Sequence, residues 1–128
     1  MTARVILTVD DDKTVLDSLK SQLKAMFGTR FQYEMAESAH EAWEVIEELH
    51  RERVKILVVV SDWLMPDVKG DEFLARVHQL DEDIVCVMLT GYADQRAVER
   101  VKAAGIVHRL LQKPWSPEDL REAIDTAL

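Results

Sequence analysis

Short apolar runs alternate along the chain with longer amphipathic segments, which is the pattern of an α/β protein. Residues 5–9 are apolar and rich in β-branched side chains, which predicts a strand. Over residues 12–27, leucines and a methionine recur on one helical face, and Gly28 is a typical helix stop. Residues 31–35 alternate between apolar and polar positions, as expected of an edge strand.

The rest of the chain continues this alternation. Residues 56–60 are apolar at every position, which indicates a central parallel strand buried on both faces. The expected strands are residues 5–9, 31–35, 56–60, 84–89 and 109–112. The expected helices have apolar faces at residues 16–26, 42–49 and 73–80. A further helix is expected over about residues 94–104, and a last one after Ser116-Pro117. Five such β-α repeats with right-handed crossovers predict an α/β fold with a doubly wound, five-stranded parallel sheet.

Composition narrows the class of protein. A length of 128 residues without a Pro/Gly-rich linker predicts one domain, residues 1–128. The net charge of -8 argues against nucleic acid and anionic membranes as direct partners, and residues 5–9 are too short for a signal peptide or membrane span. The single cysteine, Cys86, lies in an apolar run, so we expect a buried thiol and a reducing, cytoplasmic compartment.

Polar residues whose side chains could bind a ligand or react lie at the carboxyl ends of the expected strands. The first strand is followed by aspartates at residues 10–12, the third by Asp62, the fourth by Thr90 and the fifth by Lys113. Sites in such sheets form beyond the carboxyl ends of the strands, near the point where strand order reverses. Several carboxylates, a hydroxyl and an ammonium are therefore expected to meet at one edge of the sheet.

Carboxylates placed so close together repel one another and require a cation. Mg²⁺, or Mn²⁺, suits an all-oxygen site and is usually completed by water and a phosphate. A carboxylate can also attack a phosphoryl group and form an acyl phosphate. Asp62 is the best candidate for that attack, with Asp10 and Asp11 better placed to hold the metal and Lys113 to neutralise the phosphate.

Four separated motifs, in order and at suitable spacing, resemble the receiver domain of bacterial two-component response regulators. These motifs are Val9-Asp10-Asp11, Ser61-Asp62-Trp63-Leu64-Met65-Pro66 with Gly70, Leu89-Thr90-Gly91-Tyr92-Ala93-Asp94, and Lys113-Pro114-Trp115. The resemblance covers essentially the whole chain. It implies strand order 2-1-3-4-5 and the flavodoxin/CheY-like three-layer sandwich.

The resemblance also implies a role for each matching residue. Asp62 would be the phosphoacceptor and a metal ligand, and Asp11 would bind the metal directly. Asp10 would act partly through water, and the backbone carbonyl of Leu64 would be a further ligand.

The resemblance further implies how the phosphoryl group is received and read. Thr90 would hydrogen-bond the phosphoryl group and Lys113 would pair with it. The donor would be a sensor histidine kinase or a phosphotransfer protein. The output would be a changed surface on the fourth helix, fifth strand and fifth helix, which controls an effector domain, a target protein or a homodimer. The protein would then be a switch that catalyses only its own phosphoryl transfer, not an enzyme acting on other substrates.

Three positions distinguish this chain within such a family. Leu110 stands where receivers usually carry Tyr or Phe, so the output surface is expected to signal through a backbone shift. Leu64 and Tyr92 each follow a site residue by two positions, and their bulk should crowd an attacking water. We therefore expect slow self-dephosphorylation, and a phosphoryl lifetime of only seconds in purified protein with magnesium would contradict this.

Other functions remain open on the sequence. In a haloacid-dehalogenase-like phosphatase Asp10 would be the nucleophile and Asp12 the general acid, with Thr90 and Lys113 as further motifs, but Asp62 would have no role. Alternatively, Asp12 is simply a helix cap. A receiver-like module that only binds proteins would typically have lost a site residue. A flavodoxin is disfavoured because the first loop carries acids instead of the hydroxyls and glycines that cradle phosphate.

Overall fold

The computed structural model describes residues 4–91 and 95–128. Within these ranges strands and helices alternate, as the sequence predicts, and no helix combines the length and apolarity needed to cross a membrane. The strands are β1 (Arg4–Val9), β2 (Gln32–Ala36), β3 (Lys55–Asp62), β4 (Val85–Thr90) and β5 (Val107–Gln112). The helices are α1 (Lys13–Phe27), the short 3₁₀ helix η1 (Gly28–Arg30), α2 (Ala39–Arg51), α3 (Gly70–Leu80), α4 (Gln95–Ala104) and α5 (Pro117–Asp125).

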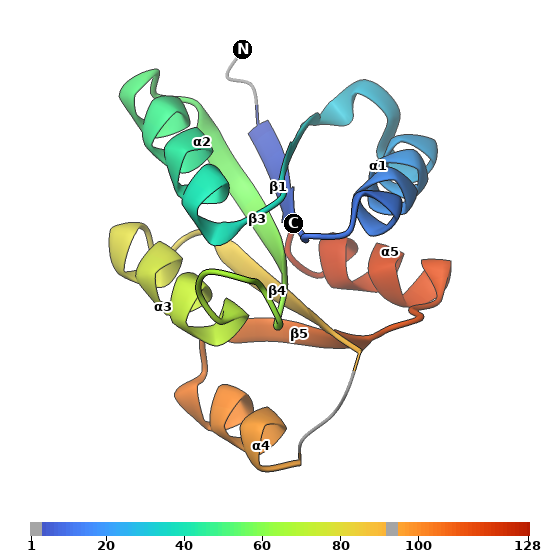
Figure 1. Ribbon diagram of the computed structural model, residues 1–128. Helices are drawn as coiled ribbons and strands as arrows, with labels where there is room; N and C mark the ends of the chain where they lie inside the picture. Colours follow the sequence, from blue (N-terminus) through green and yellow to red (C-terminus); the bar gives the residue numbers. More distant parts are fainter. Residues whose placement is uncertain (1–3, 92–94) are drawn as a thin grey trace.

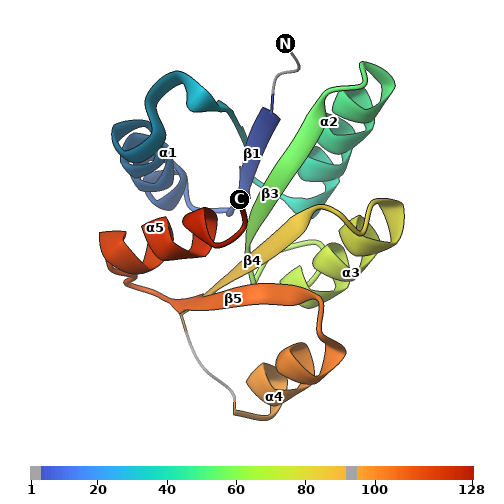
Figure 2. The ribbon, with the colours of Figure 1, turned by 180° about the vertical axis from the view of Figure 1, so that it is seen from behind.

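The strands form one parallel sheet in the order β2-β1-β3-β4-β5. Helices α1 and α5 cover one face, and α2, α3 and α4 cover the other (Figures 1 and 2). The predicted fold class, a doubly wound three-layer α/β sandwich with strand order 2-1-3-4-5, is therefore confirmed. The order reverses between β1 and β3, so the carboxyl ends of these two strands mark the expected site.

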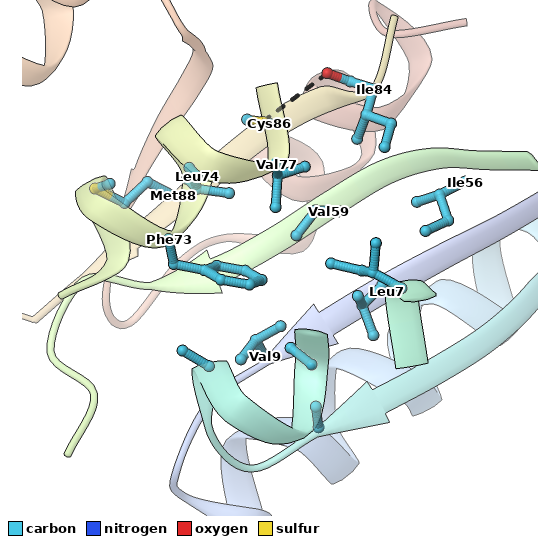
Figure 3. Close-up of a cluster of buried hydrophobic side chains, with 14 of the residues drawn as sticks. Leu7, Val9, Ile56, Val59, Phe73, Leu74, Val77, Ile84, Cys86 and Met88 are labelled. Carbon is cyan, nitrogen blue, oxygen red and sulfur yellow. Dashed lines mark hydrogen bonds between the residues drawn. The ribbon is translucent and has the colours of Figure 1, made fainter. Parts of the chain in front are cut away.

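Two apolar cores lie on opposite faces of the sheet. Strand β3 contributes to both, since its residues from Ile56 onward are buried on both faces, which explains its unbroken apolar run. In one core Phe73, Leu74 and Val77 of α3 pack toward the sheet (Figure 3). Cys86 belongs to this core, and burial raises the pKa of its thiol to about 12, as expected of an unreactive core cysteine.

Side-chain caps fix where several helices begin. Asp12 accepts a hydrogen bond from the Thr14 amide (2.9 Å), which confirms Asp12 as the cap of α1. Ser38 caps α2 and Ser116 caps α5 in the same way. Each cap typically contributes about 1 kcal/mol. These caps anchor the loops that leave the carboxyl ends of the strands.

The structure differs from the sequence prediction at a few boundaries. Strand β2 begins at Gln32, one residue later than predicted. The 3₁₀ helix η1 turns the chain after α1, and Phe31 packs edge-on against Phe27, with their ring centroids 5.7 Å apart. Strand β5 begins at Val107, two residues early, because Val107 pairs with Cys86 before an irregularity in the register. The predicted start of the fourth helix at Asp94 lies outside the described residues.

Candidate functional site

Backbone hydrogen bonds at and just beyond the carboxyl ends of the inner strands hold these ends beside one another. The Trp63 amide donates to the Leu89 carbonyl (2.9 Å), which fixes the end of β3 beside β4. The Lys113 amide donates to the Thr90 carbonyl (2.7 Å), which fixes the end of β5 beside β4. The residues that follow these strands therefore start from the same edge of the sheet.

Lys113 joins the acidic residues of the two central strands. Its Nζ lies 2.7 Å from Oδ2 of Asp10 and 3.3 Å from Oδ1 of Asp62. The Asp10 side chain is fully buried, the Asp62 side chain is 9% exposed, and Asp11 is exposed. One carboxylate oxygen from each of the three aspartates lies within 4.8 Å of the others. The structure thus brings together four of the residues that the sequence singled out.

The electrostatics of this cluster favour a bound cation. Burial, with the nearby negative charges of Asp10 and Asp11, raises the pKa of Asp62 despite the opposing effect of Lys113. Burial acts to lower the pKa of Lys113, but its hydrogen bond to Asp10 and the charge of Asp62 outweigh this and raise the pKa. Lys113 is therefore an ammonium at neutral pH, and one ammonium faces three carboxylates. The remaining negative charge and the all-oxygen donor set fit a hard divalent ion.

Two further predicted residues lie at or just beyond the carboxyl ends of the inner strands. Thr90 is the last residue of β4 and is 3% exposed, and Leu64 is 60% exposed on the loop after β3. At Gly91 a Cβ atom would meet the Lys113 side chain only at 3.9 Å, an ordinary contact. Tyr92, the other residue expected to crowd an attacking water, lies outside the described residues.

The loop between β3 and α3, residues 63–69, is closed at its base and is also bonded to α2. At its base the Gly70 amide donates to the Trp63 carbonyl (2.8 Å), and a Cβ on Gly70 would lie 2.3 Å from the Asp62 carbonyl oxygen. Only glycine permits this approach. Within the loop, the Asp67 carboxylate accepts hydrogen bonds from the Ala39 amide (3.2 Å) and the His40 amide (2.8 Å) of α2. Sequence reasoning missed Asp67, because its partners are 28 and 27 residues away and no local pattern marks it.

Leu110 lies close to the Thr90 side of the site. It lines a small apolar cavity together with Thr90, Trp63 and Met88 from the sheet side and Val98 and Val101 from α4. The side chain at the position where receivers usually carry Tyr or Phe therefore faces α4.

Comparisons with known proteins point to one family. Residues 6–125 match the family model described as the response regulator receiver domain. The chain is 30% identical over 128 residues to a chemotaxis protein CheY homolog of Campylobacter jejuni, covering 96% of this chain and 91% of that protein. It is 31% identical over 124 residues to the hydrogenase transcriptional regulatory protein HoxA of Cupriavidus necator, covering 96% of this chain but only 24% of that protein.

Solved structures agree with these sequence matches. A response regulator receiver domain protein (CheY-like) from Methanospirillum hungatei has a TM-score of 0.82 at 30% identity, covering 98% of this chain and 93% of that chain. The signal receiver domain of an HD domain-containing protein from Pseudomonas fluorescens has a TM-score of 0.85 at 26% identity, covering 98% and 94%.

Proposed function

Because this chain belongs to the response regulator receiver domain family, we propose that it is a signalling switch set by phosphorylation of Asp62. We treat residues 1–128 as one receiver domain. The observation that carries the proposal is the contact of Lys113 Nζ with both Asp10 (2.7 Å) and Asp62 (3.3 Å), with Asp11 in the same cluster. Of these acids, Asp62 is the one that a receiver would phosphorylate.

In this proposal the aspartates and a backbone carbonyl hold Mg²⁺ or Mn²⁺. Asp11 and Asp62 would bind the ion directly, Asp10 partly through water, and the Leu64 carbonyl would complete the protein ligands. The bound ion would offset negative charge on the phosphoryl oxygens during transfer. The all-oxygen donor set and the exposure of Asp11 to solvent support this assignment.

The chain's own residues perform the transfer. An Asp62 carboxylate oxygen forms a new bond to phosphorus while the bond between phosphorus and the donor breaks, and the donor atom keeps the electron pair. Lys113, which already lies 3.3 Å from Asp62, would pair with the phosphoryl oxygens. Thr90, at the end of the neighbouring strand, would hydrogen-bond the same group. The product is an acyl phosphate on Asp62, and the protein acts on no other substrate.

The rival phosphatase function is disfavoured by one contact. That function needs Asp12 as a free general acid, whereas the Asp12 carboxylate accepts the Thr14 amide at 2.9 Å and caps α1. It also leaves unexplained why Asp62 stands in the cluster with Asp10 and Asp11.

We propose two kinds of partner, one that donates the phosphoryl group and one that responds after phosphorylation. A sensor histidine kinase or a phosphotransfer protein would supply the phosphoryl group in the cytoplasm. The surface of α4, β5 and α5 would then change and control an effector domain, a target protein or homodimer formation, with Leu110 moving as Thr90 moves. HoxA, of which this chain matches only 24%, is named a transcriptional regulatory protein, which supports output through an attached domain.

A direct test of the metal-assisted transfer uses a small phosphodonor. Purified protein incubated with acetyl phosphate and Mg²⁺ should gain the mass of one phosphoryl group in intact mass spectrometry. Chelation of the divalent ion with EDTA should reduce the labelling rate at least about 100-fold, because the carboxylate cluster would then repel the anionic donor. Equal labelling with and without EDTA would refute the metal's role.

A further inference from the structure

The loop after the proposed phosphoacceptor is fastened to a helix that belongs to a different β-α repeat. Asp67 reaches the first two residues of α2, accepting the Ala39 amide at Oδ1 (3.2 Å) and the His40 amide at Oδ2 (2.8 Å). Its Oδ1 also accepts the Val68 amide (3.0 Å), which holds the carboxylate in place on its own loop. Both carboxylate oxygens are therefore used.

These bonds complete the capping of α2. The first four amides of a helix have no partner within the helix. At the start of α2, the Glu41 amide donates to the Ser38 side chain and the Ala42 amide donates to the Ser38 carbonyl. The amides of Ala39 and His40 still require acceptors. Asp67 accepts both. Its negative charge is also favourable at the positive end of the α2 dipole.

The segment before α2 is in turn bonded to the acidic loop after β1. The Asp10 amide donates to the Ala36 carbonyl (3.1 Å) at the end of β2. A continuous connection thus runs from Asp10, through Ala36 and the start of α2, to Asp67 on the loop that carries Leu64. It links the two loops that hold the proposed metal ligands.

We propose that Asp67 is a positioning residue for the metal site, holding the loop of residues 63–69, and with it the Leu64 carbonyl, at a fixed place relative to Asp10 and Asp11. This inference rests on the proposed function, because it assumes that Leu64 is a metal ligand. It adds that metal affinity depends on a carboxylate that binds no metal itself. The bond between Gly70 and Trp63 joins the two ends of the loop, and Asp67 fastens the residues between them to α2.

The charge state of Asp67 is suited to this role. Burial acts to raise the pKa of Asp67, but hydrogen bonds from the His40 and Ala39 amides outweigh it and hold the pKa below its ordinary value. The carboxylate is therefore ionised at neutral pH, and an ionised acceptor forms the stronger hydrogen bonds.

Three variants separate the hydrogen bonds of Asp67 from its charge. Asp67→Ala removes both the acceptor and the charge. Asp67→Asn removes the charge but keeps one acceptor oxygen, and Asp67→Glu keeps the charge but displaces the acceptors by one methylene. Asp83→Ala, which removes an exposed aspartate just before β4 at the opposite edge of the sheet, is the control for lost charge.

Two measurements are made on each variant by NMR of backbone amides. Titration with Mg²⁺ alone should show affinity about tenfold weaker for Asp67→Ala and Asp67→Glu, less than about threefold weaker for Asp67→Asn, and unchanged for Asp83→Ala. Hydrogen exchange without metal should speed up at both Ala39 and His40 in Asp67→Ala, but at only one of these two amides in Asp67→Asn, which keeps a single acceptor oxygen. Should Asp67→Ala fail to fold, Asp67→Glu decides, because it keeps the charge.

The outcomes distinguish this proposal from the function on which it rests. Equal Mg²⁺ affinity in all variants, with binding intact in the wild type, would overturn the role of Asp67 and leave the metal site standing. Equal weakening in Asp67→Asn and Asp67→Ala, with wild-type affinity in Asp67→Glu, would show that charge alone matters and would also overturn it. A wild type whose amides do not respond to Mg²⁺ would overturn the metal site itself.

Discussion

Replacement of Asp62 by asparagine is expected to abolish phosphorylation of the protein. The amide of asparagine has nearly the shape of the carboxylate but lacks the nucleophilic oxygen, so no acyl phosphate can form. Folding should be retained, because the change removes one of three mutually repelling carboxylates and leaves Lys113 paired with Asp10 at 2.7 Å. Intact mass spectrometry after incubation with acetyl phosphate and Mg²⁺ should show no gain of a phosphoryl group.

Asp10→Asn is the matched control for this experiment, since it makes the same chemical change in the same cluster. As a neighbour of the metal ligands, Asp10 should influence the rate without being the acceptor. Labelling of Asp10→Asn is therefore expected to be slower by about 10–100-fold but to reach completion. Full labelling of Asp62→Asn together with loss of label in Asp10→Asn would identify a phosphatase-type nucleophile instead.

Replacement of Lys113 by methionine should be the most destabilising change in the site. Methionine fills a similar volume but leaves the fully buried Asp10 carboxylate without its ammonium partner. Removing one partner of a buried ion pair is expected to lower the free energy of unfolding by about 3 kcal/mol at neutral pH without metal. Urea denaturation measures this cost, and Mg²⁺ should recover part of it, because the ion binds only the folded cluster.

A double-mutant cycle shows whether the cost belongs to this pair. In an Asp10→Asn background the same Lys113→Met change should lower the free energy of unfolding by about 1 kcal/mol, because no fully buried charge is then left without a partner. Lys102→Met, at an exposed position on α4, should change stability by less than about 0.5 kcal/mol. If Lys113→Met proved equally costly in both backgrounds, Lys113 would stabilise the protein by packing and not through Asp10.

The sequence predicts the sheet well because its strands are buried in ways that leave a clear pattern. The unbroken apolar run of β3 reflects burial on both faces, and the alternation of residues 31–35 reflects the edge position of β2. Boundaries are less predictable, since they depend on distant contacts. Phe31 leaves the strand to pack on Phe27, and Val107 joins β5 by pairing with Cys86. Neither partner can be identified from local sequence.

The central acidic cluster follows from topology alone once the strands are known. Parallel strands end at one edge of the sheet, so Asp10, Asp62 and Lys113 had to meet there, and Asp12 showed the local signature of a helix cap. Asp67 is different. Its role depends on how one loop packs against the start of a helix 27 residues earlier, which only a three-dimensional structure can show.

Direct identification of the phosphorylated residue tests the central claim most directly. Wild-type protein labelled with acetyl phosphate and Mg²⁺ can be reduced with borohydride, which converts an acyl phosphate on aspartate to homoserine, and then digested for peptide mass spectrometry. We predict homoserine at Asp62 alone, and only in the sample that contained Mg²⁺. Homoserine at Asp10, or unmodified Asp62 in protein that has taken up a phosphoryl group, would contradict the proposed function.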